Sequence, residues 1–194
     1  MSHPVQILLV TSPMNIANKI SLFRLLSVPF FIACLYYSSE RPFLRICALA
    51  IFLLAVFSDA VEGYIARKTE QKSPAGMVLD PLADKILLLS AFVFLYVLHY
   101  IPFWALLIVI TRDVLILLGC VVIYLVKQNF NMYPSRWGKL TTTFQMLSVF
   151  SYLVNARFAY IILWIAVFCT VISGALYVRK GFFILYGQNG TAKK

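Results

Sequence analysis

The sequence predicts an all-α integral membrane protein with six transmembrane helices. Of its 194 residues, 62% are hydrophobic and only 12% are charged, and the mean hydropathy is +0.88. A single soluble core cannot hide that much apolar surface, which argues against a soluble enzyme. The apolar residues fall into runs of about 20, the length that one helix needs to cross the hydrocarbon layer. The basic residues gather in alternate connections, as in multi-pass membrane proteins.

Six apolar blocks of helix length follow one another, and each connection between them carries a turn signal. No connection has the composition of an interdomain linker, so residues 1–194 are expected to form one domain. Residues 1–17 are mixed in composition and are expected to lie along the membrane interface. In chain order the blocks are residues 20–37, 43–66, 76–100, 102–126, 139–157 and 158–178. The connections that follow them are the polar turn 38–42, the basic loop 67–75, Ile101-Pro102, the loop 127–138 with Pro134 and Gly138, and the region of Asn155.

The basic residues predict how the chain is oriented. With the N-terminus in the cytoplasm, the cytoplasmic segments hold eleven lysines and arginines and the opposite segments hold three. Because cytoplasmic loops are enriched in these residues, we expect both termini and the 67–75 loop in the cytoplasm. Topology thus explains most of the net charge of +10, and we expect no nucleic-acid partner. The eleven are Lys19, Arg67, Lys68, Lys72, Lys127, Arg136, Lys139, Arg179, Lys180, Lys193 and Lys194; the three are Arg41, Arg45 and Arg157.

The cysteines and histidines predict neither a disulfide framework nor a metal site. The four cysteines are widely spaced, and each lies in an apolar stretch, as small core residues do. His3 and His99 are not paired with each other or with a carboxylate at a ligand spacing. Any bound metal must therefore be held by oxygen atoms. The cysteines are Cys34, Cys47, Cys120 and Cys169.

Four of the seven acidic residues lie within 26 residues, at the cytoplasmic ends of the second and third predicted spans. Asp59 and Glu62 are three residues apart, so they share one face of a helix. Asp80 and Asp84 are four residues apart and share a face in the same way. Four carboxylates in a low-dielectric pocket need compensating cations, and hard divalent cations prefer oxygen ligands. The spacing therefore predicts a site for two Mg²⁺ or Mn²⁺ ions.

Small and basic residues flank these acids. Gly63 and Gly76 remove side chains where a ligand would approach the backbone, and Arg67, one turn beyond Gly63, suits a diphosphate. The acids could instead be surface charge partners of Arg67, Lys68 and Lys72. Paired spacing on two helices with flanking glycines is more than surface pairing requires, which favours the metal site.

The segment from Asp59 to Asp84 resembles the signature D-x2-D-G-x2-A-R-x8-G-x3-D-x3-D of the CDP-alcohol phosphatidyltransferases. Seven of its eight fixed positions match at the required spacing. Within that family, the run LDPLADK at residues 79–85 is similar to phosphatidylglycerophosphate synthases and to the cardiolipin synthases of the same fold. The resemblance implies six transmembrane helices around a cytoplasm-facing polar cavity. It also suggests a homodimer.

The resemblance further implies a reaction and the roles of the site residues. The chain would transfer a phosphatidyl group from CDP-diacylglycerol to an alcohol and release CMP, as a step of phospholipid biosynthesis. The four acids would hold two Mg²⁺ or Mn²⁺ ions, and Asp84 would also take the proton from the acceptor hydroxyl. The residues that would bind the cytidine diphosphate are Asn18, Ser21, Gly63, Arg67 and Gly76.

Cations inside the spans predict the charge of the acceptor. Arg24, Lys85 and Arg112 lie within predicted spans, where a cation needs an anionic partner. Lys139 lies at the mouth of the fifth span. Together they would clamp a phosphate, which favours glycerol 3-phosphate over an uncharged or cationic alcohol. Phosphatidylglycerol, the acceptor of the cardiolipin synthases, also carries a phosphate and is the alternative.

Other interpretations fit some of the same residues. Arg112 could pair with its neighbour Asp113, and Lys85 could simply balance Asp84. Glu62 stands where the family has its second aspartate. Its longer side chain could lower activity, shift the metal preference towards Mn²⁺ or mark a catalytically silent relative. A transporter would usually carry acids at mid-membrane and often repeats. Here four acids lie together at one face, the later spans hold no comparable group, and the sequence shows no internal repeat.

Overall fold

The structure is a computed structural model that describes residues 16–69, 74–126 and 136–186. Most of the segment expected to lie along the membrane interface, residues 1–17, falls outside these ranges. Side chains are described for residues 22–59, 61, 85–119 and 137–182.

The described residues form six α-helices and one short 3-10 helix, with no strand among them, which confirms the all-α prediction. Pro42 and Pro74 begin the second and third α-helices, at the position where a missing N–H breaks no helical hydrogen bond. In chain order the elements are α1 (Ile16–Tyr36), the 3-10 helix η1 (Tyr37–Ser39), α2 (Pro42–Thr69), α3 (Pro74–Val97), α4 (Phe103–Val126), α5 (Arg136–Leu153) and α6 (Ala159–Tyr186).

α3 and α5 end earlier than the sequence predicts, because a residue in the left-handed conformation follows each of them. His99 and Asn155 each have φ of 59°, the left-handed conformation that often follows a helix end. After α3, the Tyr100 N–H donates to the Leu95 carbonyl at 2.9 Å, and the same pattern of bonds follows α5. The predicted ends at residues 100 and 157 are therefore wrong by three and four residues. α6 instead continues eight residues past its predicted end at residue 178, since Arg and Lys are good helix formers.

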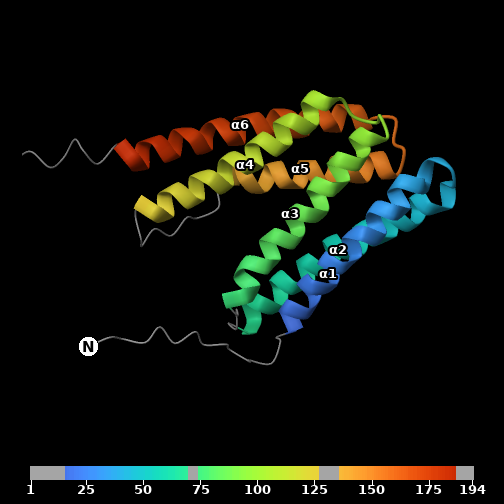
Figure 1. The fold of residues 1–194 in the computed structure, drawn as a ribbon, viewed down its shortest axis with the longest axis horizontal. Coiled ribbons are helices and arrows are strands. Elements are labelled where there is room, and N and C mark those ends of the chain that lie inside the picture. The colour runs from blue at the N-terminus through green and yellow to red at the C-terminus, as the bar shows by residue number, and fades with distance from the viewer. Residues whose placement is uncertain (1–15, 70–73, 127–135, 187–194) are drawn as a thin grey trace, which may run out of the picture.

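The helices form two groups of three (Figure 1). α1 packs against α2 and α3, and α6 packs against α4 and α5. The two groups meet near the turns that follow α1, α3 and α5, and they splay apart towards the opposite end. At this splayed end, the start of α1, the end of α2 and the start of α3 lie together. The two halves of the acidic motif are thus carried by helix ends that are close in space.

The two ends of the bundle have different interiors. The end near the turns contains the hydrophobic core, in which Phe31, Phe52, Phe92 and Leu163 are almost fully buried. Towards the splayed end, the buried side chains include charged and polar ones. These are Arg24 of α1, Arg112 of α4, Thr141 and Gln145 of α5, and Thr170 and Ser173 of α6. Among the described residues, the buried charged side chains therefore lie towards the half that carries the acidic motif, whereas the buried polar side chains near the turns are serines such as Ser38 and Ser151.

Three helices in the described part of the chain are long and apolar enough to cross a membrane. They contain the segments Leu22–Ser39, Pro42–Asp59 and Ala159–Phe182. Large apolar side chains on the surfaces of these helices are exposed, with Phe30 68% exposed and Phe43 70% exposed. Exposed apolar side chains around buried polar ones are what a lipid environment favours, so this is a membrane protein.

Candidate functional site

Asp59 and Arg24 form an ion pair between α2 and α1. Arg24 Nη1 lies 3.2 Å from Asp59 Oδ1; the Arg24 side chain is fully buried, whereas 41% of the Asp59 side chain is exposed. One oxygen of the Asp59 carboxylate therefore contacts a buried arginine, while part of the side chain stays accessible to a ligand. The arginine that we expected at the acceptor phosphate thus contacts a predicted metal ligand.

The other three acids of the motif lie on the same two helices. α2 is continuous through Asp59 and Glu62, so these positions are nearly one turn apart. α3 is continuous through Asp80 and Asp84, which are about one turn apart. For eight of the expected site residues the structure describes only the helical backbone, and their roles stay predictions. These are Asn18, Ser21, Glu62, Gly63, Arg67, Gly76, Asp80 and Asp84.

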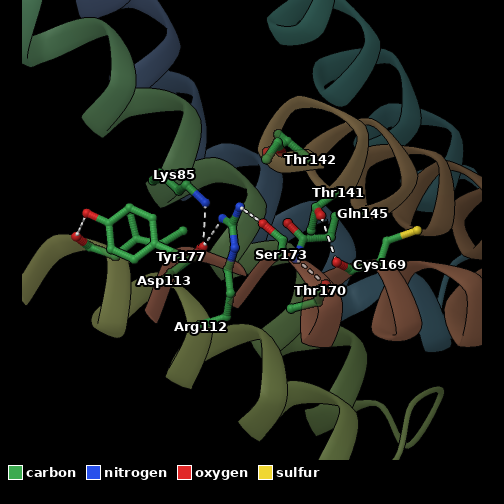
Figure 2. Close-up of polar contacts among 12 residues, drawn as sticks. Lys85, Arg112, Asp113, Thr141, Thr142, Gln145, Cys169, Thr170, Ser173 and Tyr177 are labelled. Atoms are coloured by element: carbon green, nitrogen blue, oxygen red, sulfur yellow. Dashed lines mark hydrogen bonds and ion pairs between the residues drawn. The ribbon is translucent and has the colours of Figure 1, made fainter. Parts of the chain in front are cut away.

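A second charged cluster joins α3, α4 and α6 (Figure 2). Asp113 Oδ1 accepts a hydrogen bond from Lys85 Nζ at 2.6 Å and another from Arg112 Nη1 at 2.7 Å. Arg112 Nη2 also donates to Ser173 Oγ at 3.1 Å. The exposed fraction of the side chain is 7% for Arg112, 16% for Asp113 and 38% for Lys85. Two of the four cations expected at the acceptor phosphate are thus brought together by one carboxylate.

The sequence predicts only part of this cluster. The pairing of Arg112 with its neighbour Asp113 is one of the expected alternatives, and that pair is present. The sequence does not predict the bond from Lys85 to Asp113, because that bond depends on how α3 packs beside α4. Ser173 was also missed, since one serine in an apolar helix gives no signal of its own. Lys139 is exposed in the first turn of α5 and forms no ion pair with any side chain in the described part of the chain.

Polar contacts join α5 to α6 beside this cluster (Figure 2). The Thr141 hydroxyl lies within hydrogen-bond distance of two carbonyls, Trp137 of α5 at 2.8 Å and Cys169 of α6 at 3.0 Å. Gln145 Nε2 donates to Thr170 Oγ1 at 3.0 Å. The side chains of Thr141, Gln145 and Thr170 are buried. Hydrogen bonds between membrane helices contribute about 0.6 kcal/mol each on average, and they fix how one helix is placed along the other. They therefore help to keep Ser173 within reach of Arg112.

The predicted metal site offers oxygen donors alone. Among the described side chains, no three residues of the types His, Cys, Asp and Glu come together. Asp59 presents a partly exposed carboxylate beside a buried cation, so it has room for a further ligand. A set of carboxylates fits Mg²⁺ or Mn²⁺ rather than a metal that prefers sulfur or nitrogen.

The chain is similar to known proteins over most of its length. Residues 14–172 match the family model described as CDP-alcohol phosphatidyltransferase. A probable phosphatidylglycerophosphate synthase of Mycobacterium tuberculosis is 31% identical over 185 residues, which cover 92% of this chain and 87% of the relative. The CDP-diacylglycerol–glycerol-3-phosphate 3-phosphatidyltransferase of Bacillus subtilis is 29% identical over 193 residues, covering 90% and 99%. The protein of the same name from Wigglesworthia glossinidia brevipalpis is 33% identical over 177 residues, covering 89% and 96%.

Proposed function

The chain belongs to the CDP-alcohol phosphatidyltransferase family, and we propose that it transfers the phosphatidyl group of CDP-diacylglycerol to glycerol 3-phosphate and releases CMP. The product is phosphatidylglycerophosphate, so the chain is a transferase of phospholipid biosynthesis. The observation that carries the proposal is the acidic motif from Asp59 to Asp84, on two helices whose motif-bearing ends lie together. The names of relatives that align over almost their whole length support the choice of acceptor.

We assign two Mg²⁺ or Mn²⁺ ions to the four acids of the motif. Bound there, such ions stabilise both the attacking and the leaving oxygen in a displacement at phosphorus. The partly exposed carboxylate of Asp59 supports this assignment. The ion pair with Arg24 favours a role for that arginine in orienting Asp59, as residues behind a metal ligand commonly do.

Asp84 is the general base in this proposal. Its carboxylate takes the proton of the acceptor hydroxyl, whose oxygen forms a bond to the lipid-side phosphorus of the donor. The bond from that phosphorus to the bridging oxygen breaks, and CMP leaves with the electron pair. Arg67 binds the diphosphate through its planar guanidinium, which matches phosphate oxygens in pairs. The other residues assigned to the cytidine diphosphate are Asn18, Ser21, Gly63 and Gly76.

The second cluster supports a phosphorylated acceptor. Lys85 and Arg112 donate to the same oxygen of Asp113, so an ammonium and a guanidinium lie side by side in the polar half of the bundle. Adjacent cations in the interior of a membrane protein favour an anionic ligand. We assign the phosphate of glycerol 3-phosphate to these two side chains and to Lys139 at the start of α5. Acceptors without a phosphate, such as serine, have no group that would bind to these three side chains.

We also propose that residues 1–194 form one domain with six spans, α1 to α6, around a polar cavity that faces the cytoplasm. The three long apolar helices support a membrane-spanning bundle. Successive helices run in opposite directions, so the start of α1 and the ends of α2, α4 and α6 face one side. Eleven lysines and arginines belong to that side, which supports placing it in the cytoplasm. Residues 1–17 then lie along the cytoplasmic interface.

Incubation of the purified chain with CDP-diacylglycerol, Mg²⁺ or Mn²⁺ and one acceptor at a time tests the proposed function. We expect CMP release with glycerol 3-phosphate and little with serine or inositol, which carry no phosphate. Release with phosphatidylglycerol alone would indicate a cardiolipin synthase instead. The variant Asp84→Asn should abolish release, and the matched variant Glu40→Gln, in the turn after α1, should behave as wild type. No release with any acceptor would contradict the proposal.

A further inference from the structure

The proposed reaction leaves one partly buried acid without a role. Asp113 lies on α4, outside the motif, and only 16% of its side chain is exposed. We propose that Asp113 is a positioning residue of the acceptor site, which holds Lys85 and Arg112 in the arrangement that receives the acceptor phosphate. This inference rests on the proposed function and adds to it a residue that contacts neither the metals nor the phosphorus atoms.

Arg112 is fixed from two sides. Its Nη1 donates to Asp113 at 2.7 Å, and its Nη2 donates to Ser173 of α6 at 3.1 Å. Gly174 lies against the aliphatic part of the side chain, where an added methyl group would meet Arg112 Cγ at 3.6 Å. A guanidinium held at both of its terminal nitrogens, Nη1 and Nη2, has a set orientation, which a planar group needs in order to bind phosphate through two hydrogen bonds.

Lys85 depends on Asp113 in a different way. Its side chain is 38% exposed, and it reaches from α3 to α4 to donate at 2.6 Å. An ammonium on a flexible four-carbon stem has no orientation of its own, so this charge-assisted bond sets where the ammonium lies. Lys85 directly follows Asp84 in the sequence. The same bond therefore ties the turn of α3 that carries the proposed base to α4.

A positioning role differs from a purely structural one in what its loss affects. If the cluster only stabilised the bundle, removing the Asp113 charge would alter catalysis with both substrates alike. If Asp113 positions the two cations, its loss should mainly weaken the use of glycerol 3-phosphate. It should also reduce the effect of removing Lys85, because the two residues would act through one contact.

The test compares steady-state kinetics of the full chain in lipid nanodiscs, varying glycerol 3-phosphate and CDP-diacylglycerol separately. We expect Asp113→Asn to raise the KM for glycerol 3-phosphate about tenfold or more, because a neutral acceptor replaces a charge-assisted one. The KM for CDP-diacylglycerol should stay within about twofold. Asp113→Glu, which keeps the charge, should recover most of the loss. Lys85→Met should cost much less in the Asp113→Asn background than in wild type.

Three outcomes would overturn the positioning role while the wild-type chain remains active. They are an unchanged KM for glycerol 3-phosphate in Asp113→Asn, an equal rise in both KM values, and additive effects of Asp113→Asn and Lys85→Met. If Asp113→Asn does not fold, Asp113→Ser removes the same charge with a smaller polar side chain, and a KM for glycerol 3-phosphate that does not rise in that variant would overturn the inference. Glu40→Gln is the matched control for loss of one acidic charge. A wild-type chain that releases no CMP would instead contradict the proposed function itself.

Discussion

Arg24 Nη1 and Asp59 Oδ1 lie 3.2 Å apart, which links a fully buried cation on α1 to the first acid of the motif on α2. A metal ligand is oriented by the groups behind it, and loss of such a group typically costs 10- to 100-fold in metal affinity or activity, in order of magnitude. The ion pair thus joins the first span, far from the motif in sequence, to the proposed metal site.

Replacement of Arg24 should therefore affect metal use. We expect Arg24→Gln to raise the Mg²⁺ or Mn²⁺ concentration for half-maximal activity by about tenfold or more, because Asp59 loses its orienting partner. Arg24→Lys should restore part of the loss. A metal titration of CMP release measures this, with Arg41→Gln in the exposed turn after α1 as the matched control. An unchanged titration curve in Arg24→Gln would show that the ion pair does not serve the site.

Arg45 stabilises the end of the bundle away from the motif. Its Nε donates to the Leu153 carbonyl at 2.9 Å, and its Nη2 donates to the Tyr152 carbonyl, at the end of α5. The guanidinium also lies over the Tyr100 ring, 5.2 Å from the ring centre. We expect Arg45→Gln to lower the free energy of unfolding by about 1–3 kcal/mol, because the hydrogen bonds to two backbone carbonyls and a cation–π contact are lost.

The activity of folded Arg45→Gln protein should equal that of wild type. Arg45 lies in the first turn of α2 and bonds to the end of α5, whereas the motif lies at the end of α2 and the start of α3. Unfolding in mixed micelles gives the stability, and Arg157→Gln, an exposed arginine near the same end, is the control. Equal stability of Arg45→Gln and Arg157→Gln would refute this role.

Gly119 allows α4 and α6 to come close. A methyl group on Gly119 would lie 2.7 Å from Tyr177 Cε1, so the ring would have to move away from the Ile116 carbonyl, to which its hydroxyl donates at 3.2 Å. We expect Gly119→Ala to destabilise the protein by about 1–3 kcal/mol. Gly181→Ala, where an added methyl group meets nothing within 4 Å, should be neutral or slightly stabilising.

The cause of the Gly119 effect can be checked with a second substitution. If the clash with the ring is responsible, Gly119→Ala should cost less when combined with Tyr177→Leu than it does alone. Equal costs in the two backgrounds would place the cause elsewhere. Thermal unfolding of the four proteins in one detergent is sufficient for this comparison.

Glu62 should set the choice of metal. Chelation by EDTA is expected to abolish CMP release, and either Mg²⁺ or Mn²⁺ should restore it. Glu62→Asp should preserve or raise activity and increase the ratio of Mg²⁺-supported to Mn²⁺-supported rate, because Mg²⁺ tolerates little departure from octahedral geometry. A complete loss of activity in Glu62→Asp would show that the pocket is built around the longer side chain.

The sequence predicted the existence of the six helices better than their ends. Runs of apolar residues predict helices because the thickness of the hydrocarbon layer is fixed. His99 and Asn155 end α3 and α5 through a left-handed backbone conformation; Asn155 marks a turn in the sequence but not the residue at which the helix ends. Six α-helices are present, and three of them contain long apolar segments in the described part of the chain. The orientation in the membrane stays a prediction based on charge.

The site was predictable where it is local in sequence and less so where it depends on packing. The pairing of Arg112 with Asp113 joins neighbours, so it could be anticipated. The bonds from Arg24 to Asp59 and from Lys85 to Asp113 join different helices, and nothing in the sequence fixes which helix faces which. Arg24 and Lys85 could be predicted to need anionic partners, but the partners themselves came only from the fold.

The most direct test of the central claim follows the acceptor into the product. Glycerol 3-phosphate labelled in its glycerol carbons is incubated with the purified chain, CDP-diacylglycerol and Mn²⁺ or Mg²⁺, and label in the lipid extract is compared with CMP released. We expect one labelled lipid molecule per CMP, dependent on both CDP-diacylglycerol and the metal and absent in Asp84→Asn. Release of CMP without label in lipid, or label that enters lipid without CDP-diacylglycerol, would contradict the transfer reaction.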